Sequence, residues 1–153
     1  LISRPNDQSI SQLRYEGYVQ ALESHGIPVD PELVISTGGF GAKDAYRAVQ
    51  EKMAENVDFT ALFAIADSMA IGAMRALMDA GRRIPEDCSV IAIDGLELSA
   101  YIEPPLTTLC QPMEEMGRRS AEILLDMVRH KGSHACELLP TTLRQGRSVA
   151  APG

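Results

Sequence analysis

Residues 84–95 read IPEDCSVIAIDG, a turn followed by an apolar strand that ends on an acid and a glycine. Two similar apolar runs come earlier, LVIS at 33–36 and FTALFAI at 59–65. Runs that are apolar throughout, rather than at alternate positions, are typical of parallel strands buried on both faces. Helical patterns at 42–53 and 68–80 separate these runs, which predicts right-handed crossovers between neighbouring strands. We therefore expect an α/β fold with a doubly wound parallel sheet.

Further elements are predicted on either side of this region. A helix that begins at residue 9 or 11 and ends near 25 precedes the first run. The β-branched stretch LTTLCQP at 106–112 leads into a helix at 113–130, which is apolar along one side and charged on the other. Segments 136–139 and 143–149 read as short final strands. The apolar side of the helix at 113–130 needs a sheet to cover it.

Composition limits the classes of protein that this chain can be. Its 153 residues carry a net charge of −7, and its 14 lysines and arginines are scattered, so the chain alone is not expected to bind DNA. No apolar run reaches the ~18 residues that a membrane span needs, so no membrane contact is expected. Three widely spaced cysteines favour reduced thiols and a cytoplasmic location. The opening LIS is typical of the end of a strand, so we expect additional sequence upstream.

The carboxyl ends of the predicted strands are where a ligand would bind, because helix N-termini and free amides converge there in an open α/β sheet. Phe40, Asp67 and Asp94 follow three of these strands. Arg14 lies on the inward side of its helix by the 3.6-residue period, where a charge needs a partner. Carboxylates accept hydrogen bonds from hydroxyls and an aromatic ring offers a stacking surface, so this set suits a small polar ligand with one apolar face.

Each of these residues also has a purely structural interpretation. Arg14 could form an internal ion pair, Asp67 could cap the helix that follows it, and Phe40 could anchor its loop through hydrophobic packing. Asp94 could serve a turn at the end of its strand. The residue pattern alone leaves both interpretations open.

Catalytic and metal chemistry lack a sequence signal. TGGFGAK at 37–43 has neither the Gly-Lys-Ser/Thr ending of a phosphate loop nor the spacing of a dinucleotide turn. His130, His134 and Cys136 have no fourth ligand nearby and read as a solvated loop. No GxSxG motif or nucleophile with a neighbouring base is present. We expect no enzyme activity, no cofactor and no metal.

Several motifs together carry a family resemblance over nearly the whole chain. They are RYEGYVQALESHGIPVD at 14–30, ALFAIADSMAIGAMRAL at 61–77, GRRIPEDCSVIAIDG at 81–95, PPLTTLCQP at 104–112 and LRQGRSV at 143–149. In this order they resemble the effector-binding core of the lactose-repressor (LacI) family of bacterial transcription regulators.

The resemblance implies a periplasmic-binding-protein-like fold of type I, with two α/β subdomains and the effector in the cleft between them. Residues of about 4–99 and 141–153 would form most of the C-terminal subdomain, and about 110–139 would be part of the N-terminal subdomain. The rest of that subdomain and the DNA-reading helix-turn-helix would be absent from this chain. A chain that supplies one side of the cleft is expected to bind effector weakly or not at all.

The resemblance also assigns residues to the cleft. Arg14 matches the family's arginine that grips ligand hydroxyls or carboxylates, and Phe40 the aromatic residue that stacks on a sugar or base. Asp94 matches the pocket aspartate, and Gln111 a polar residue at the crossover between subdomains. Together they imply a polar effector, with a sugar as the expected class.

Two positions depart from the family's pattern. Asp67 matches the acidic half of a common Asn-Asp pair, but Ala66 stands where the asparagine would be. Gly95 stands where a second acidic residue is frequent. Both changes remove hydrogen-bonding groups, so the contact set for lactose-type or purine-type ligands is not expected in full.

A homodimer is the expected form, with an isologous interface. The resemblance places its contacts at Ile71, Met74 and Arg75 on one helix, and near Tyr101 and Ile102 in the loop beyond it. The alternative for the methionine is ordinary core packing.

The function implied is that of an effector-sensing core, which couples small-molecule binding to operator affinity through DNA-binding elements outside this chain. Two other classes remain at this point. A periplasmic sugar-binding protein of a transport or chemotaxis system would have an upstream signal peptide instead of a helix-turn-helix. An α/β enzyme that uses Asp67 or Asp94 as a base would need a nearby histidine, lysine or metal.

Overall fold

The computed structural model describes residues 1–3, 10–130 and 136–151, and its centre is a six-stranded sheet. The strand order is β2-β1-β3-β4-β5-β6, and every pairing is parallel except that of β5 with β6. The strands are β1 (Ile2–Ser3), β2 (Ile35–Ser36), β3 (Ala61–Ala64), β4 (Ser89–Asp94), β5 (Thr107–Cys110) and β6 (Thr142–Arg144). The predicted doubly wound parallel sheet is confirmed.

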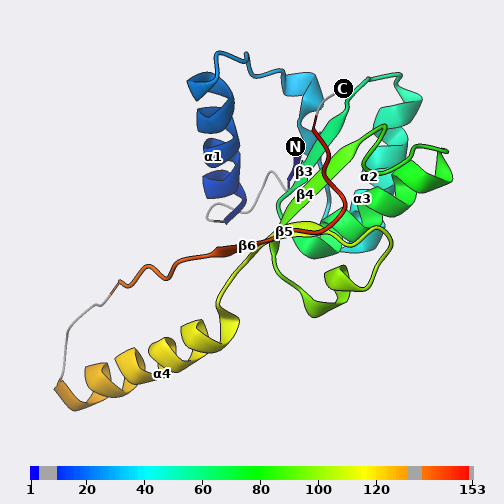
Figure 1. Ribbon diagram of the computed structural model, residues 1–153. Helices are drawn as coiled ribbons and strands as arrows, with labels where there is room; N and C mark the ends of the chain where they lie inside the picture. The colour runs from blue at the N-terminus through cyan, green and yellow to red at the C-terminus, as the bar shows by residue number, and fades with distance from the viewer. Residues whose placement is uncertain (4–9, 131–135, 152–153) are drawn as a thin grey trace.

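Helices cover both faces of the sheet to different extents. They are α1 (Ile10–Ser24), α2 (Ala42–Ala54), α3 (Asp67–Asp79) and α4 (Met113–His130), with short 3₁₀ turns η1 (Pro31–Leu33) and η2 (Glu97–Ala100). Figure 1 shows α2 and α3 together on one face, α1 on the other, and α4 standing away from the sheet beyond β5 and β6. Strands β5 and β6 therefore join α4 to the rest of the described chain, and we call them the crossing strands.

The core lies between the sheet and α3, which is buried almost all round. Met69, Met74 and Leu77 of this helix are fully or almost fully buried. On its outer side α3 packs against α2, and a Cβ added at Gly72 would lie only 1.9 Å from the carbonyl oxygen of Ala42. No side chain fits at this position. The absence of one at Gly72 allows the backbone of α2 at Ala42 to lie directly against α3.

The opposite face of the sheet is covered only in part. A hollow of about 900 Å³ remains beside α1, and Tyr18, Phe63 and Ile91 are among its lining residues. The backbone nitrogen of Leu1 donates to the carbonyl oxygen of Leu33 at 2.9 Å. The hollow lies over the amino-terminal and middle parts of β3 and β4, away from the strand ends where the candidate ligand residues gather.

Helix α4 leaves exposed the apolar side that was expected to need a sheet to cover it. Met113, Leu124 and Val128 are all more than 60% exposed, and α4 packs closely against no other helix or strand in the described part of the chain. The residues with this amphipathic period therefore form a helix although no sheet covers its apolar side.

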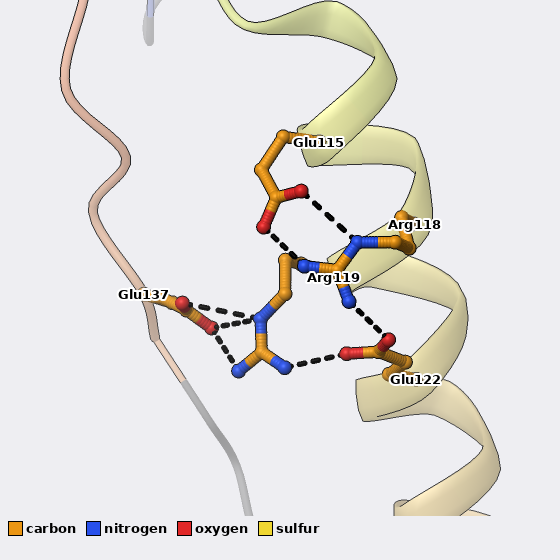
Figure 2. Close-up of polar contacts among 5 residues, drawn as sticks. All are labelled: Glu115, Arg118, Arg119, Glu122 and Glu137. Carbon is orange, nitrogen blue, oxygen red and sulfur yellow. Dashed lines mark hydrogen bonds and ion pairs between the residues drawn. The ribbon is translucent and has the colours of Figure 1, made fainter.

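The charged side of α4 carries several ion pairs (Figure 2). Arg118 pairs with Glu115 and Glu122 on its own helix. Arg119 reaches Glu122 and also Glu137, with Nε to Oε2 at 2.9 Å, so the returning segment is held against the helix. These contacts raise the pKa of the Arg119 guanidinium above its ordinary value.

Two expectations for the C-terminal part need correction. Residues 136–139 form no strand, because they have no neighbouring strand with which to pair among the described residues. Strand β6 ends at Arg144 rather than continuing to 149, because at Gly146 the chain passes so close to Pro105 that a Cβ would lie 2.2 Å from its carbonyl oxygen. Beyond it, Ser148 still bonds to β4 by accepting from the backbone N–H of Val90 at 2.7 Å.

All three cysteines are free thiols. Cys88 is buried, and burial raises its pKa to about 11. Cys110 is partly buried and Cys136 is exposed. No disulfide therefore links these three residues in the structure.

Candidate ligand-binding site

Asp94 ends β4 at the carboxyl edge of the sheet in an unusual backbone conformation. Its φ is +137°, a region that residues with a side chain rarely adopt, and the next residue, Gly95, has φ +80°. A Cβ at Gly95 would lie 2.6 Å from Sγ of Cys110 and 2.7 Å from its Cα. The close approach of β5 therefore leaves no room for a side chain at this position. Strain of this kind concentrates at functional sites.

Arg14 reaches this carboxylate from α1, on the other side of the sheet edge. Its Nη2 lies 3.5 Å from Oδ1 of Asp94, and its Nη1 donates to the carbonyl oxygen of Ile65. The Arg14 side chain is 18% exposed and that of Asp94 is 26% exposed. The inward orientation predicted for Arg14 from helical period is confirmed, and its partner is the aspartate at the end of β4.

Gln111 joins the same carboxylate from the chain just beyond β5. Its Nε2 donates to Oδ1 of Asp94 at 2.8 Å. Three side chains from α1, β4 and the residues before α4 therefore converge on one point. Arg14 and Asp94 belong to the part of the chain that contains the sheet, whereas Gln111 lies where the chain leaves β5 toward α4.

Burial and the neighbouring groups shift the pKa of Asp94 in opposite directions. Burial is the main cause that raises its pKa above the ordinary value, and the Arg14 charge, a backbone hydrogen bond from Asp67 and the Gln111 amide each lower it. A carboxylate that is partly desolvated yet still partly open to solvent gains most from a ligand that donates hydrogen bonds to it.

Phe40 occupies the loop between β2 and α2. Its side chain is partly buried and packs against the hydrophobic core. The hydroxyl of Ser68, in the first turn of α3, donates to the Phe40 carbonyl oxygen at 2.7 Å and holds this loop in place. The loop-anchoring interpretation of Phe40 is therefore supported.

Asp67 lies in a different setting from the one the sequence suggested. It is the first residue of α3, its side chain is 0% exposed, and its oxygens already accept hydrogen bonds from protein groups. It is not the helix cap either, because Ala66 holds that position without a side-chain bond. A ligand has no open path to this carboxylate in the structure, so Asp67 leaves the set of side chains that would touch one.

Sequence reasoning missed the partners that surround Asp67. Ser99 in η2, Thr108 in β5 and Arg144 in β6 come together around it, although they are 32, 41 and 77 positions away along the chain. No local spacing connects them. The one available signal was the acid itself, which stands between apolar residues at the start of a buried helix.

The residues expected at a dimer interface divide into two groups. Met74 is 1% exposed and belongs to the core, so its side chain is not available to a partner. Ile71 and Ile102 are partly buried, and the Arg75 side chain is 69% exposed. Tyr101, just beyond η2, is 77% exposed, so exposed apolar side chains remain among the expected interface residues without Met74.

Other kinds of site find little support in the described residues. Over residues 1–3, 10–130 and 136–151 no group of three or more His, Cys, Asp or Glu side chains could hold a metal ion. His134, one of the residues considered for such a site, lies outside the described residues. No described helix is both long enough and apolar enough to cross a membrane.

Comparison with known proteins agrees with this geometry. Residues 1–149 match the family of periplasmic binding protein-like domains. The HTH-type transcriptional regulator MalR of Clostridium butyricum is 37% identical over 138 residues, which cover 90% of this chain and 41% of MalR. This chain therefore spans about two fifths of the length of that curated relative.

Solved structures give the same result. The transcriptional regulator CelR in complex with cellobiose has a TM-score of 0.88 and 35% identity, covering 96% of this chain and 45% of that one. A LacI family transcriptional regulator from Enterococcus faecium with bound ribose has a TM-score of 0.86 and 31% identity, covering 97% of this chain and 55% of that one. These relatives are regulators, which disfavours the transport alternative. The chain belongs to the periplasmic binding protein-like domain family, in the form found in LacI-type transcriptional regulators.

Proposed function

We propose that this chain is part of the effector-sensing core of a LacI-type transcriptional regulator, with a sugar or a related polar metabolite as the effector. The observation that carries the proposal is the convergence of Arg14, Asp94 and Gln111 at the carboxyl edge of the sheet. A carboxylate, a guanidinium and an amide offer both donors and acceptors to neighbouring hydroxyl groups. Phe40 would supply the apolar surface for one face of a sugar ring. The cellobiose and ribose bound to the two related structures support this ligand class.

The mechanism proposed is closure about the crossing strands. Residues of about 4–99 and 141–153 would form one subdomain, and about 110–139 part of the other. A ligand held by Asp94 on one side and Gln111 on the other would favour the arrangement in which both contacts are made. In the complete regulator this change would alter the affinity of a DNA-binding domain for its operator, and no catalytic step is involved.

We also propose that the regulator acts as a cytoplasmic homodimer. Ile71 and Arg75 lie on the same face of α3, one helical turn apart, and Met78 continues that face. Met78 is 41% exposed, and Leu98 and Tyr101 of the neighbouring η2 region are 62% and 77% exposed. With Ile102 these residues would form the interface, as an apolar surface with a charged rim.

Ligand binding can be tested on the chain itself. Titration of the isotope-labelled chain with millimolar cellobiose or ribose should perturb amide signals at residues 14, 94 and 111 in NMR spectra. Asp94→Asn should weaken binding about tenfold or more, because a hydrogen bond to a charged group is worth about 1.5–3 kcal/mol. Asp58→Asn is the matched control, since Asp58 is exposed and pairs with Arg82 instead. Perturbations confined to other surfaces, or equal in the two variants, would contradict the proposed site.

The regulatory role has its own test. The coding sequence upstream of Leu1 should specify a helix-turn-helix, and the protein that includes it should bind an operator fragment with an affinity that changes when effector is added. A secretory signal peptide in that place would refute the regulatory assignment even if the ligand site were correct.

A further inference from the structure

The carboxylate of Asp67 lies near the site, and both of its oxygens accept hydrogen bonds. The function proposed above gives it no role. One oxygen, Oδ2, accepts from the backbone N–H of Leu96 at 2.8 Å and from the Ser99 hydroxyl at 2.7 Å. The other, Oδ1, accepts from the Thr108 hydroxyl at 2.5 Å. Three separate parts of the chain, the loop after β4, η2 and β5, are therefore bonded to one buried acid.

Arg144 adds β6 to the same cluster. Its Nη2 lies 4.0 Å from Oδ2 of Asp67 and donates to the carbonyl oxygen of Leu96 at 2.9 Å and to the Ser99 hydroxyl. We call these five residues, Asp67, Leu96, Ser99, Thr108 and Arg144, the Asp67 cluster. Thr108 thus links β5 to the N-terminus of α3 by a hydrogen bond, and Arg144 links β6 to it by a long ion pair and through Ser99.

The position of the cluster in the fold decides what it can do. In the described part of the chain, β5 leads out to α4 and β6 leads back from its neighbourhood (Figure 1). Any rotation of α4 relative to the sheet must change the geometry of these two strands where they leave the body. The Asp67 cluster holds both of them at that place.

The same residue also faces the ligand site. Oδ2 of Asp67 accepts from the backbone N–H of Leu96, only two residues beyond Asp94. The backbone amide of Asp67 lowers the pKa of Asp94, and its negative charge raises it. Among the described residues, the charged groups that act on Asp94 are Arg14 from α1 and Asp67 from α3. The first turn of α3 therefore contacts the ligand-binding acid through its backbone and the crossing strands through its side chain.

We propose that Asp67 is a positioning residue that couples Asp94 to the pivot formed by β5 and β6. It acts through other groups and does not touch the ligand. When a ligand draws on Asp94, the N-terminus of α3 moves with it, and the bonds to Thr108, Ser99 and Arg144 carry that movement to the strands that bear α4. This inference rests on the proposed function for its biological meaning, but its physical content concerns the chain without ligand.

The experiment uses the full 153-residue chain and two substitutions with different chemistry. Asp67→Asn removes the charge and one of the two acceptor oxygens. Thr108→Val keeps the shape of the side chain and the Asp67 charge but removes one hydrogen bond. Hydrogen exchange reports the local stability of each strand, and carbon-detected NMR reports the titration of the Asp94 carboxyl.

Both variants should lose hydrogen-exchange protection at β5 and β6 by about tenfold or more relative to β3, because a bond to a charged acceptor is lost at the pivot. Only Asp67→Asn should lower the pKa of Asp94, since only this change removes a neighbouring negative charge. A residue that held the strands but did not act on Asp94 would produce the first effect without the second.

Two results would overturn the proposal. One is that Thr108→Val loses no hydrogen-exchange protection at β5 and β6, or loses it equally over the whole sheet. The other is an unchanged Asp94 titration in folded Asp67→Asn. Should Asp67→Asn not fold, Ser99→Ala joins Thr108→Val, and the location of the lost protection in these two variants decides. None of these measurements needs an effector, so they remain valid if sugar binding fails, and failure of the proposed function would be recognised separately.

Discussion

Replacing Gly72 by alanine should destabilise the protein, although alanine is the better helix former. Gly72 lies inside α3, where α2 begins against it at Ala42. The new Cβ would lie 1.9 Å from the Ala42 carbonyl oxygen and 2.8 Å from its Cα. Since ordinary contact begins near 3.4 Å, the start of α2 would have to move by about 3.4 − 1.9 = 1.5 Å.

Two effects of opposite sign set the magnitude. Gly→Ala in a helix interior stabilises by about 1 kcal/mol. Overpacking costs about 1–3 kcal/mol, and the upper end applies because the obstacle is backbone, which cannot rotate away. The free energy of unfolding should therefore fall by about 2 kcal/mol in Gly72→Ala. The shift at the start of α2 should also displace Phe40, two residues upstream, and weaken ligand contact on that side.

Gly117→Ala is the matched control. Gly117 is also inside a helix, α4, but a Cβ there meets nothing within 4 Å. This variant keeps the propensity gain without the clash, so exchange of α4 amides should slow by about fivefold, the equivalent of ~1 kcal/mol.

Urea unfolding followed by circular dichroism measures the difference. With a slope of about 1–3 kcal/mol per molar urea, Gly72→Ala should lower the midpoint by about 1 M, and Gly117→Ala should not lower it. A Gly72→Ala protein as stable as the parent, or a similar loss in both variants, would show that the close approach of α2 and α3 is not what requires the glycine.

Three further predictions concern charge and association. Because burial raises the pKa of Asp94, the folded state holds its proton more tightly than the unfolded state, so the free energy of unfolding should fall as pH rises from about 4 through that raised pKa. Asp94→Asn should flatten this dependence in urea unfolding, whereas sugar binding, which uses the ionised form, should weaken as pH falls through the same range. Tyr101→Asp should weaken self-association in sedimentation at least tenfold, and Leu138→Asp, at an exposed position outside the proposed interface, should leave it unchanged. Glu137→Gln should speed hydrogen exchange in residues 137–139 by freeing them from Arg119, and unchanged exchange would show that this ion pair does not hold the segment.

Patterns within one element were sufficient to predict the order of strands and helices, apart from the strand expected at 136–139. Continuous apolar runs located β3 and β4, and α4 was predicted with its observed ends because its amphipathic period is unbroken. The same reasoning located Asp94 at the sheet edge and turned Arg14 toward it, since strand ends and helical period are local properties. Their direct contact then follows from the parallel topology.

Contacts between distant segments could not be predicted in this way. Met74 lies in the core because α3 is buried on nearly every side, and period alone cannot separate a core face from an interface face when both are apolar. Asp67 read as a ligand residue because its position at a strand end is visible in the sequence, while its partners Ser99 and Thr108 are not. Gly95 similarly read as a missing acid until the close approach of Cys110 gave the physical reason for it.

The three free thiols differ enough in their surroundings to make the unmodified chain suitable for site-selective labelling. Maleimides react with the thiolate, and the pKa of about 11 leaves buried Cys88 protonated at neutral pH. Cys136 is exposed, next to the residue whose ion pair holds the returning segment against α4. A fluorophore attached there would lie beyond β5 and β6 from the sheet, so its emission would follow the position of α4 without an engineered cysteine.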